Sequence, residues 1–181
     1  MMTRFLEKKL GRTFNKDASV TTRRYVTGEV RKRDLLIDDI ASTTGLIVKV
    51  DEDGDGLVSD ETALVLSTDL LLRGEGLDLD PDQGSEPQPW VELWIPPFYN
   101  DARITSFPPN TLVSVTAIHG WPAIPSAIVR AMYQLTGIWR LESPRATQRI
   151  PEGIEQAIAS SPEAQSILDQ VLAPYRRRWY F

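Results

Sequence analysis

The clearest alternation of apolar and polar positions in the chain lies between Val113 and Leu141. From Val113 to Ala117, valine and alanine alternate with serine and threonine, which is the two-residue period of a half-buried strand. Further along, apolar residues recur at the spacing of one helix face: Ile128, Ala131, Met132, Leu135 and Ile138. The pattern therefore predicts a strand that leads into one amphipathic helix of roughly 16 residues.

The residues between this strand and this helix predict a tight corner: Gly120, Trp121, Pro122 and Pro125. Glycine permits backbone angles that other residues resist, and prolines stiffen the chain. Pro125 stands where a first helical residue would, a position whose N–H needs no partner. We expect this corner to be the structural joint between a β-rich part and a helical part of the molecule.

Shorter patterns predict the elements that precede this segment. A short helix runs from Thr3 to Leu10, with Thr3 as its cap and Gly11 as its end. Runs of β-forming residues separated by turn residues predict short strands: Val20 to Tyr25, Leu35 to Ile37, Leu46 to Val50, Leu64 to Leu66 and Trp90 to Ile95. Gly74 to Pro89 has little apolar content, so we expect an exposed loop there.

After the long helix, Ser143 to Ile150 is a polar connection and Pro151 to Ala159 has a weak helical pattern. Ser161, Pro162 and Glu163 are a cap, a first-turn proline and a first-turn acid, which together predict a helix start. Pro174 would end that helix. The chain alternates too little between strand and helix for a parallel α/β sheet.

The predicted fold is therefore α+β. We expect a short N-terminal helix, a β-rich region of five or six short strands forming a small sandwich or barrel, and two C-terminal helices with an extended tail. The expected organisation is a single domain over residues 1–174, followed by a tail over 175–181. Its helical part spans 1–12 and 125–174, and its β-rich part spans 19–120.

Composition excludes several kinds of site in this chain of 181 residues, which has no cysteine and a single histidine. Neither a disulfide nor a cysteine- or histidine-rich metal site can form. A net charge of −5 disfavours a sequence-reading nucleic-acid binder. No apolar run approaches the ~20 residues of a membrane span and no signal peptide is evident. We expect a protein made in a cytoplasm, with no membrane partner.

The segment from Asp51 to Thr62 imitates a calcium-binding loop of the EF-hand type. Asp51, Asp53 and Asp55 stand at the first three ligand positions, and Gly56 at the sharp bend. The glutamate of the twelfth position is replaced by Thr62, and the segment before the loop is predicted as a strand. Because a hairpin turn needs the same Asp and Gly residues, we interpret the segment as a turn and keep a calcium site as the alternative.

No catalytic residue is predicted. His119 stands at a strand end, and no nucleophile motif accompanies it. No glycine-rich phosphate loop is present either, because Gly74-Glu-Gly76 is followed by acidic residues, which would repel phosphate. We therefore expect no cofactor.

The chain ends in a run of aromatic and arginine residues: Tyr175, Arg176, Arg177, Arg178, Trp179, Tyr180 and Phe181. These residue types are enriched in binding hot spots, so we interpret the tail as a docking segment. In the alternative, Trp179 and Phe181 fold back onto their own domain.

Several segments, in order, carry a resemblance to a known family. They are Leu10 to Phe14, Arg24-Tyr25, Leu36 to Ile40, Thr44 to Val48 with the Asp-Gly turn, Val115 to Pro125, Glu142 to Pro144, and Val171 to Arg176. On these the chain resembles the head-to-tail adaptor (connector) proteins of long-tailed phages of the type found in phages of actinobacteria. The chain departs from the family at its front, where members often have a longer helical hairpin.

The resemblance implies a structural protein of the virion neck, between capsid and tail, with no catalysis. It implies a homo-oligomeric ring of twelve subunits that binds the portal protein on one side. A stopper or other tail-side neck protein would bind on the other, and DNA would pass through the lumen without sequence-specific binding. The ring would assemble in the host cytoplasm, and the tail from Tyr175 to Phe181 would dock on the portal. The alternative function is a calcium-dependent binding module built on Asp51 to Thr62.

Overall fold

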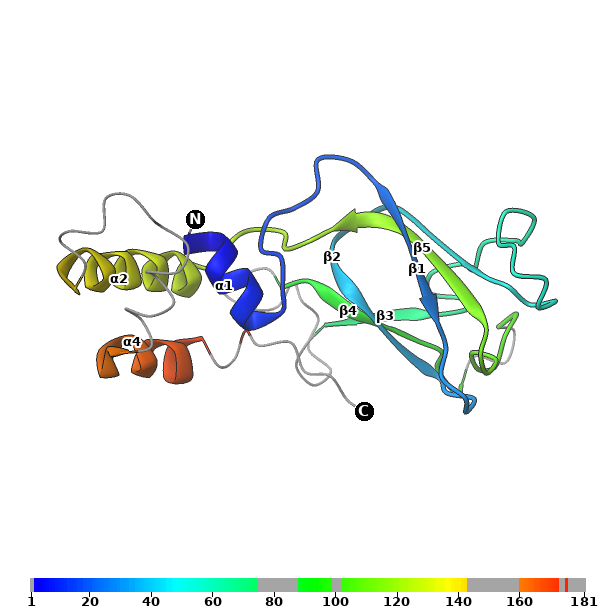
Figure 1. Cartoon of the computed structure of the whole chain (residues 1–181). Helices are drawn as coiled ribbons and strands as arrows, with labels where there is room; N and C mark the ends of the chain where they lie inside the picture. The colour runs from blue at the N-terminus through cyan, green and yellow to red at the C-terminus, as the bar shows by residue number, and fades with distance from the viewer. Residues whose placement is uncertain (1, 75–87, 99–101, 143–159, 173–174, 176–181) are drawn as a thin grey trace. The chain divides into compact units, whose positions relative to one another are not determined.

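The computed structural model describes residues 2–74, 88–98, 102–142, 160–172 and 175 (Figure 1). The chain divides into two compact units. One, called the helical unit below, comprises Met1–Phe14 with Ile124–Phe181, and the other, the sheet unit, is Asn15–Ala123. One boundary between the units lies between Phe14 and Asn15, and the other lies between Ala123 and Ile124, inside the segment of the predicted joint.

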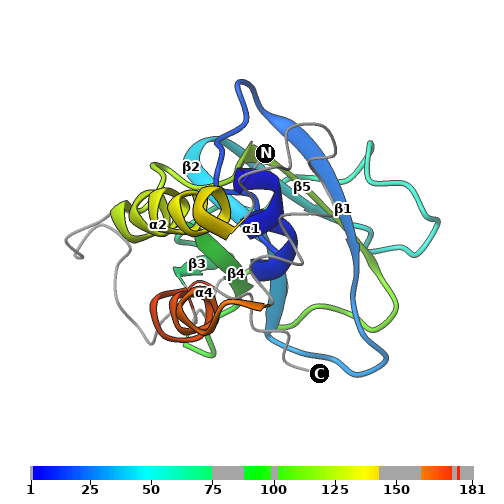
Figure 2. The same cartoon turned by 60° about the vertical axis from the view of Figure 1, so that its left-hand side comes forward.

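The sheet unit contains one antiparallel sheet of five strands in the order β1-β5-β2-β4-β3 (Figures 1 and 2). The strands are β1 (Thr21–Val26), β2 (Asp34–Val50), β3 (Leu71–Gly74), β4 (Trp90–Trp94) and β5 (Leu112–His119). Together with the helices this confirms the predicted α+β class. The order is not sequential, because β5, the last strand in the chain, inserts between β1 and β2.

β2 corrects the prediction of two separate strands with a turn over Ser42 to Gly45. It is one strand of 17 residues that pairs with β4 through its first half and with β5 through its second. On β2, the four residues Thr43 to Leu46 lie between two positions that pair with β5. On β5, only Ala117 lies between the two partners of these positions. The turn-forming residues therefore make a bulge, with Gly45 at φ 75°, and the strand continues beyond it.

The core of the sheet unit gathers the inward-facing residues of these strands. Val113, Val115 and Ala117 of β5 are fully buried, as their alternation predicts. They pack with residues of β2 and β4, of the segment between β2 and β3, and of the loop before β5: Ile37, Ile40, Val48, Val50, Leu64, Leu70, Leu93, Ile95, Ile104 and Phe107. The burial of so many branched aliphatic side chains stabilises the unit mainly through the hydrophobic effect.

One smaller prediction for this unit is wrong, and one strand was not predicted. Leu64 to Leu66 is not a strand: Leu64 forms one antiparallel bridge with Val48, and Leu66 bridges to Leu70. The strand that was not predicted is β3, which pairs with β4. β3 has only four residues, and their burial does not alternate along the strand. Such a short segment has no two-residue period from which a strand could be predicted.

The helical unit contains α1 (Met2–Leu10), α2 (Ser126–Glu142), α4 (Pro162–Ser166) and the π-helical turn η2 (Ile167–Val171). Helix α2 packs against the other three elements. Its apolar stripe is inward as predicted, with Ile128, Ala131 and Leu135 fully buried. α4 begins as predicted, because the Ser161 hydroxyl accepts a hydrogen bond from the N–H of Ala164.

Two details at helix starts differ from the prediction by a position. α1 begins at Met2, so Thr3 lies inside its first turn and is not the cap. α2 begins at Ser126, and the carbonyl of Pro125 accepts a hydrogen bond from the N–H of Val129 at 3.1 Å. Pro125 is therefore the residue before the first turn.

The predictions for the loop of residues 75–87, the polar connection of 143–150, the weak helix of 151–159 and Pro174 lie outside the described residues. Among the helices that the structure does describe, none combines the length and the apolar character needed to cross a bilayer.

Candidate functional site

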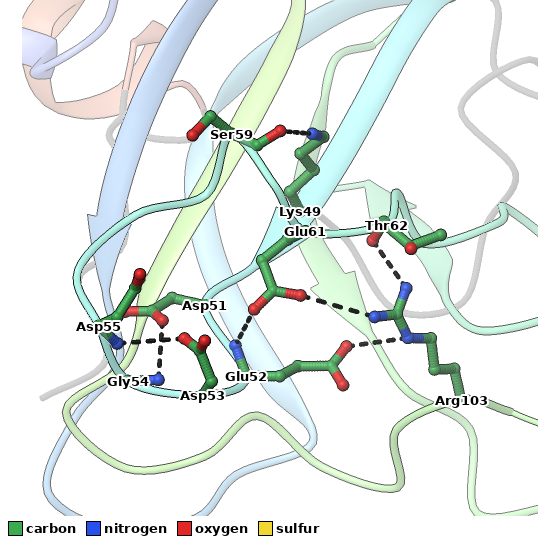
Figure 3. Close-up of polar contacts among 10 residues, drawn as sticks. All are labelled: Lys49, Asp51, Glu52, Asp53, Gly54, Asp55, Ser59, Glu61, Thr62 and Arg103. Carbon is green, nitrogen blue, oxygen red and sulfur yellow. Dashed lines mark hydrogen bonds and ion pairs between the residues drawn. The ribbon is translucent and has the colours of Figure 1, made fainter.

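The Asp51 loop, defined as residues Asp51 to Thr62, is tied together by hydrogen bonds from backbone to carboxylate (Figure 3). Asp51 is buried, and its two carboxylate oxygens accept from the N–H groups of Gly54 at 2.9 Å and Gly56 at 3.0 Å. Asp53 accepts from the N–H of Asp55, and Asp55 from that of Leu57. Gly54 and Gly56 have positive φ angles of 78° and 83°, which glycine adopts without strain.

Arg103 holds the other side of this loop (Figure 3). Its guanidinium contacts Glu52 at 3.0 Å and Glu61 at 3.6 Å, and donates to the carbonyl of Thr62 at 2.9 Å. Glu61 also accepts from the N–H of Glu52 at 2.8 Å. The loop thus has two halves: an aspartate turn at its start, and an arginine-bound glutamate pair that closes it.

The aspartate half brings together the three predicted ligands. One carboxylate oxygen each of Asp51, Asp53 and Asp55 lies within 4.8 Å of the other two. Calcium takes six to eight oxygen ligands, often including a bidentate glutamate near the end of such a loop. Here Glu61 and the Thr62 carbonyl are bound by Arg103, so the described residues provide an incomplete ligand set in this conformation.

The predicted joint is fixed inside the sheet unit by contacts to two distant segments. Gly120 has a φ of 104°, and a Cβ at this position would lie 2.1 Å from the carbonyl oxygen of Asn15, so no other residue fits. Its N–H donates to the carbonyl of Asp39 at 2.8 Å. Trp121 is buried, and its indole Nε1 donates to the Asp39 carboxylate at 3.1 Å.

His119 lies at the end of β5 and is completely buried. Neither ring nitrogen has a hydrogen-bond partner among the described residues. Burial lowers the pKa of its imidazole, and the nearby Arg23 guanidinium lowers it further. The lowered pKa favours the neutral imidazole at neutral pH, and the position of the residue at the end of β5 agrees with the predicted strand end.

A cluster of polar side chains from β1 and β2 lies near His119. The Arg23 guanidinium contacts the Asp38 carboxylate at 2.9 Å, and the Tyr25 hydroxyl donates to the same carboxylate at 3.1 Å. Burial, the largest cause, and the charge of Asp38 raise the pKa of Tyr25 to about 12. The tyrosine therefore stays protonated as a hydrogen-bond donor and has no role as a base.

The described part of the predicted tail is Tyr175, which belongs to the helical unit. Its ring is half-buried and meets the ring of Phe14 edge to face, with the centroids 6.5 Å apart. Arg176, Arg177, Arg178, Trp179, Tyr180 and Phe181 lie outside the described residues. A docking segment that leaves the helical unit would therefore begin after Tyr175.

The sequence predicted the aspartates of the Asp51 loop and the joint, but it did not predict the residues that bind this loop and this joint. Arg103 binds Glu52 and Glu61 from more than forty positions away along the chain. Asp39 reaches Trp121 across 82 positions. Neither Arg103 nor Asp39 has a local motif, so only the folded structure identifies them. No family model matches the chain, and no curated protein is similar to it.

Proposed function

We propose that this protein is a structural component of the neck of a long-tailed phage virion. In this proposal it forms a ring, of twelve subunits in the related adaptors, that joins the portal to the stopper or tail and leaves a channel for DNA. It performs no catalysis, uses no cofactor and contacts no membrane. Its place is between capsid and tail.

One observation carries the proposal: two segments of the adaptor resemblance contact each other in the sheet unit. Leu36 to Ile40 provides Asp39, and Val115 to Pro125 provides Gly120 and Trp121. Asp39 accepts from both of the latter, through its carbonyl and its carboxylate. If the chain shares its fold with the adaptors, the segments that resemble them should contact one another. A chance similarity in composition would instead involve segments with no contact between them.

The chemistry of the buried groups also favours a structural role. The sole histidine is buried and neutral, and Tyr25 is held protonated by burial beside Asp38. Neither group is placed to exchange protons with a bound substrate. Tyr25 instead donates a hydrogen bond to Asp38 inside the sheet unit, a contact that suits a structural role.

Net charge suits a channel wall. Each subunit carries a formal charge of −5, and a ring multiplies that charge around one axis. A negative field repels the phosphate backbone, so DNA would pass through the ring without binding strongly to it.

Portal docking is assigned in this proposal to the tail from Tyr175 to Phe181, with the free segment starting at Arg176. The test is co-purification with the portal protein of the same virion, using the full chain and a chain that lacks Arg176–Phe181. We expect the full chain to bind and the truncated chain to bind at least tenfold more weakly, because aromatic and arginine residues carry most binding energy at interfaces. Equal binding by both chains would reject the tail as the docking segment, and no binding by either would reject the neck assignment.

A second candidate is a calcium-dependent binding module, favoured by the convergence of Asp51, Asp53 and Asp55 within 4.8 Å. Titration calorimetry with calcium separates it from the first. A calcium site predicts heat of binding for the wild type that Asp53→Ala abolishes. The matched control is Asp60→Ala, an exposed acid of the same loop outside the cluster. An equally flat response from all three chains would leave no calcium site.

A further inference from the structure

The outward face of α2 has a composition that the helical unit itself does not explain. This face consists of Ser126, Val129, Arg130, Tyr133, Gly137 and Arg140, which lie opposite the buried stripe. Tyr133 stands at its centre and is 77% exposed, the largest exposed fraction among the large apolar residues that the structure describes. A ring so accessible to water forgoes most of the free energy that its burial would give.

Gly137 is the second unexplained feature of the α2 face. Glycine inside a helix costs stability relative to alanine, so a mid-helix glycine usually has a packing reason. A Cβ at Gly137 would have no neighbour within 4 Å among the residues that the structure describes. The space above this position, beside Tyr133, is therefore open to the close approach of another molecule.

The α2 face is also positively charged. From Ser126 to Arg140 the sequence has two arginines and no acidic residue. Arg130 and Arg140 are exposed, and neither has an ion-pair partner among the described residues. A partner for this face should therefore offer carboxylates around an apolar contact.

The same unit has a second face with that complementary charge. The segment from Pro162 to Val171 contains two acids and no base. Ala164 and Leu168 of this segment and Leu172 directly after it are buried, while Glu163 on the outer side is exposed. Because α2 packs against α4 and η2, each of these elements turns its buried stripe into the unit and its other side outward. The unit thus has two different surfaces of opposite charge.

We propose that the α2 face is an interface between copies of this chain, and that its occupant is the α4–η2 face of a second copy. This inference rests on the proposed ring and identifies its closing contact. A ring requires two different, complementary surfaces on each subunit, because each copy meets its two neighbours in head-to-tail fashion. Tyr133 fills the centre of the contact, Gly137 permits close packing of the helices, and the arginines face carboxylates of the neighbour.

Nucleic acid is the competing occupant, since arginines also bind phosphate. The α2 face fits a protein better. A phosphate backbone is bound through cationic and hydrogen-bonding groups and gains little from Val129 or from a bare glycine. Helix-to-helix packing uses both, together with a central aromatic residue.

The test compares the native mass of the full chain and its variants over a range of concentrations, alone and with portal protein. Tyr133→Glu places a charge at the centre of the contact, and the matched control Val65→Glu does so at a side chain of the sheet unit that is 56% exposed. We expect Tyr133→Glu to raise the concentration needed for assembly at least tenfold and Val65→Glu to leave it unchanged.

Gly137→Ala should raise the melting temperature of the free chain, because alanine favours the helix, and yet weaken assembly.

A charge exchange completes the test. Arg130→Glu and Glu163→Arg should each weaken assembly, and the chain with both changes should recover it, since every interface then regains opposite charges. Normal assembly by Tyr133→Glu and by Gly137→Ala would overturn the interface while the ring stands. A wild-type chain that stays monomeric with portal present would overturn the ring and the interface together. Loss of DNA binding by Tyr133→Glu with unchanged assembly would assign the face to nucleic acid and overturn the inference.

Discussion

At the scale of single residues, Asp39 links two segments that are distant along the chain. Its backbone carbonyl fixes Gly120 and its carboxylate binds the indole of Trp121. The sequence predicted the corner at Gly120 and Trp121 from glycine and proline chemistry, but Asp39 is one of two adjacent aspartates and nothing local distinguishes it from Asp38. The structure assigns them different partners, since Asp38 binds Arg23 and Tyr25.

Replacing Trp121 by alanine tests the joint. Because its side chain is 4% exposed, Trp121→Ala should lower the free energy of unfolding by roughly 3–5 kcal/mol through loss of burial and creation of a cavity. Trp121→Phe removes the hydrogen bond to Asp39 and leaves a smaller cavity than alanine does, so its cost should be about 1–3 kcal/mol. Urea unfolding of both variants measures the difference. Wild-type stability for Trp121→Ala would disprove the structural role of the joint.

His119 predicts how stability depends on pH. Burial lowers the pKa of the folded imidazole below the 6.5 of an unfolded chain. As the pH falls below about 6.5, the unfolded state takes up a proton that the folded state resists. The unfolded state then binds more protons, so the contribution of His119 makes the protein less stable as the pH decreases.

The measurement is urea unfolding at pH 7.5 and pH 5.5 for the wild type and for His119→Gln, which cannot ionise. The wild type should lose more stability on acidification than the variant does, because carboxylate contributions are common to both. If the two chains lose the same amount, the imidazole is not held neutral in the folded protein.

At the scale of elements, amphipathic patterns predicted most helices and strands correctly. α1, α2, β1, β4 and β5 all lie where the periodicity indicated. β2 was predicted as two separate strands and β3 was not predicted, for different reasons. The Ser42 to Gly45 segment has the composition of a turn, but pairing with β5 on both sides keeps it within one strand. β3 is too short to have a strand period in its sequence. It forms because its backbone pairs with the free edge of β4.

The start of α4 gives a prediction at this scale. Ser161 is buried, and its hydroxyl accepts a hydrogen bond from the N–H of Ala164 at 3.3 Å. Ser161→Ala should destabilise the helix by about 1 kcal/mol, since the first-turn N–H loses its acceptor. The exposed Ser166→Ala is the matched control, and it should be neutral or slightly stabilising because alanine favours helix. Hydrogen exchange at Ala164 reports the result, and equal exchange in both variants would show that the cap contributes nothing.

At the scale of the whole molecule, the sequence predicted the class and the sequential order of elements but not the sheet order. The order β1-β5-β2-β4-β3 depends on which strands bury their apolar faces together, and strand periodicity holds no information on neighbours. The same limit applies to the surfaces. The tyrosine, glycine and arginines of the α2 face were visible in the sequence, but only the packed helices identify them as one outward surface.

The central claim is that copies of this chain close into a ring at the virion neck. The most direct measurement is the mass and rotational symmetry of the full-length protein, by native mass spectrometry and electron microscopy, with and without the portal protein of the same virion. Our account predicts a closed ring of identical subunits when portal is present, with the twelvefold symmetry implied by the adaptor resemblance. A chain that remains monomeric at high concentration with portal present would contradict it.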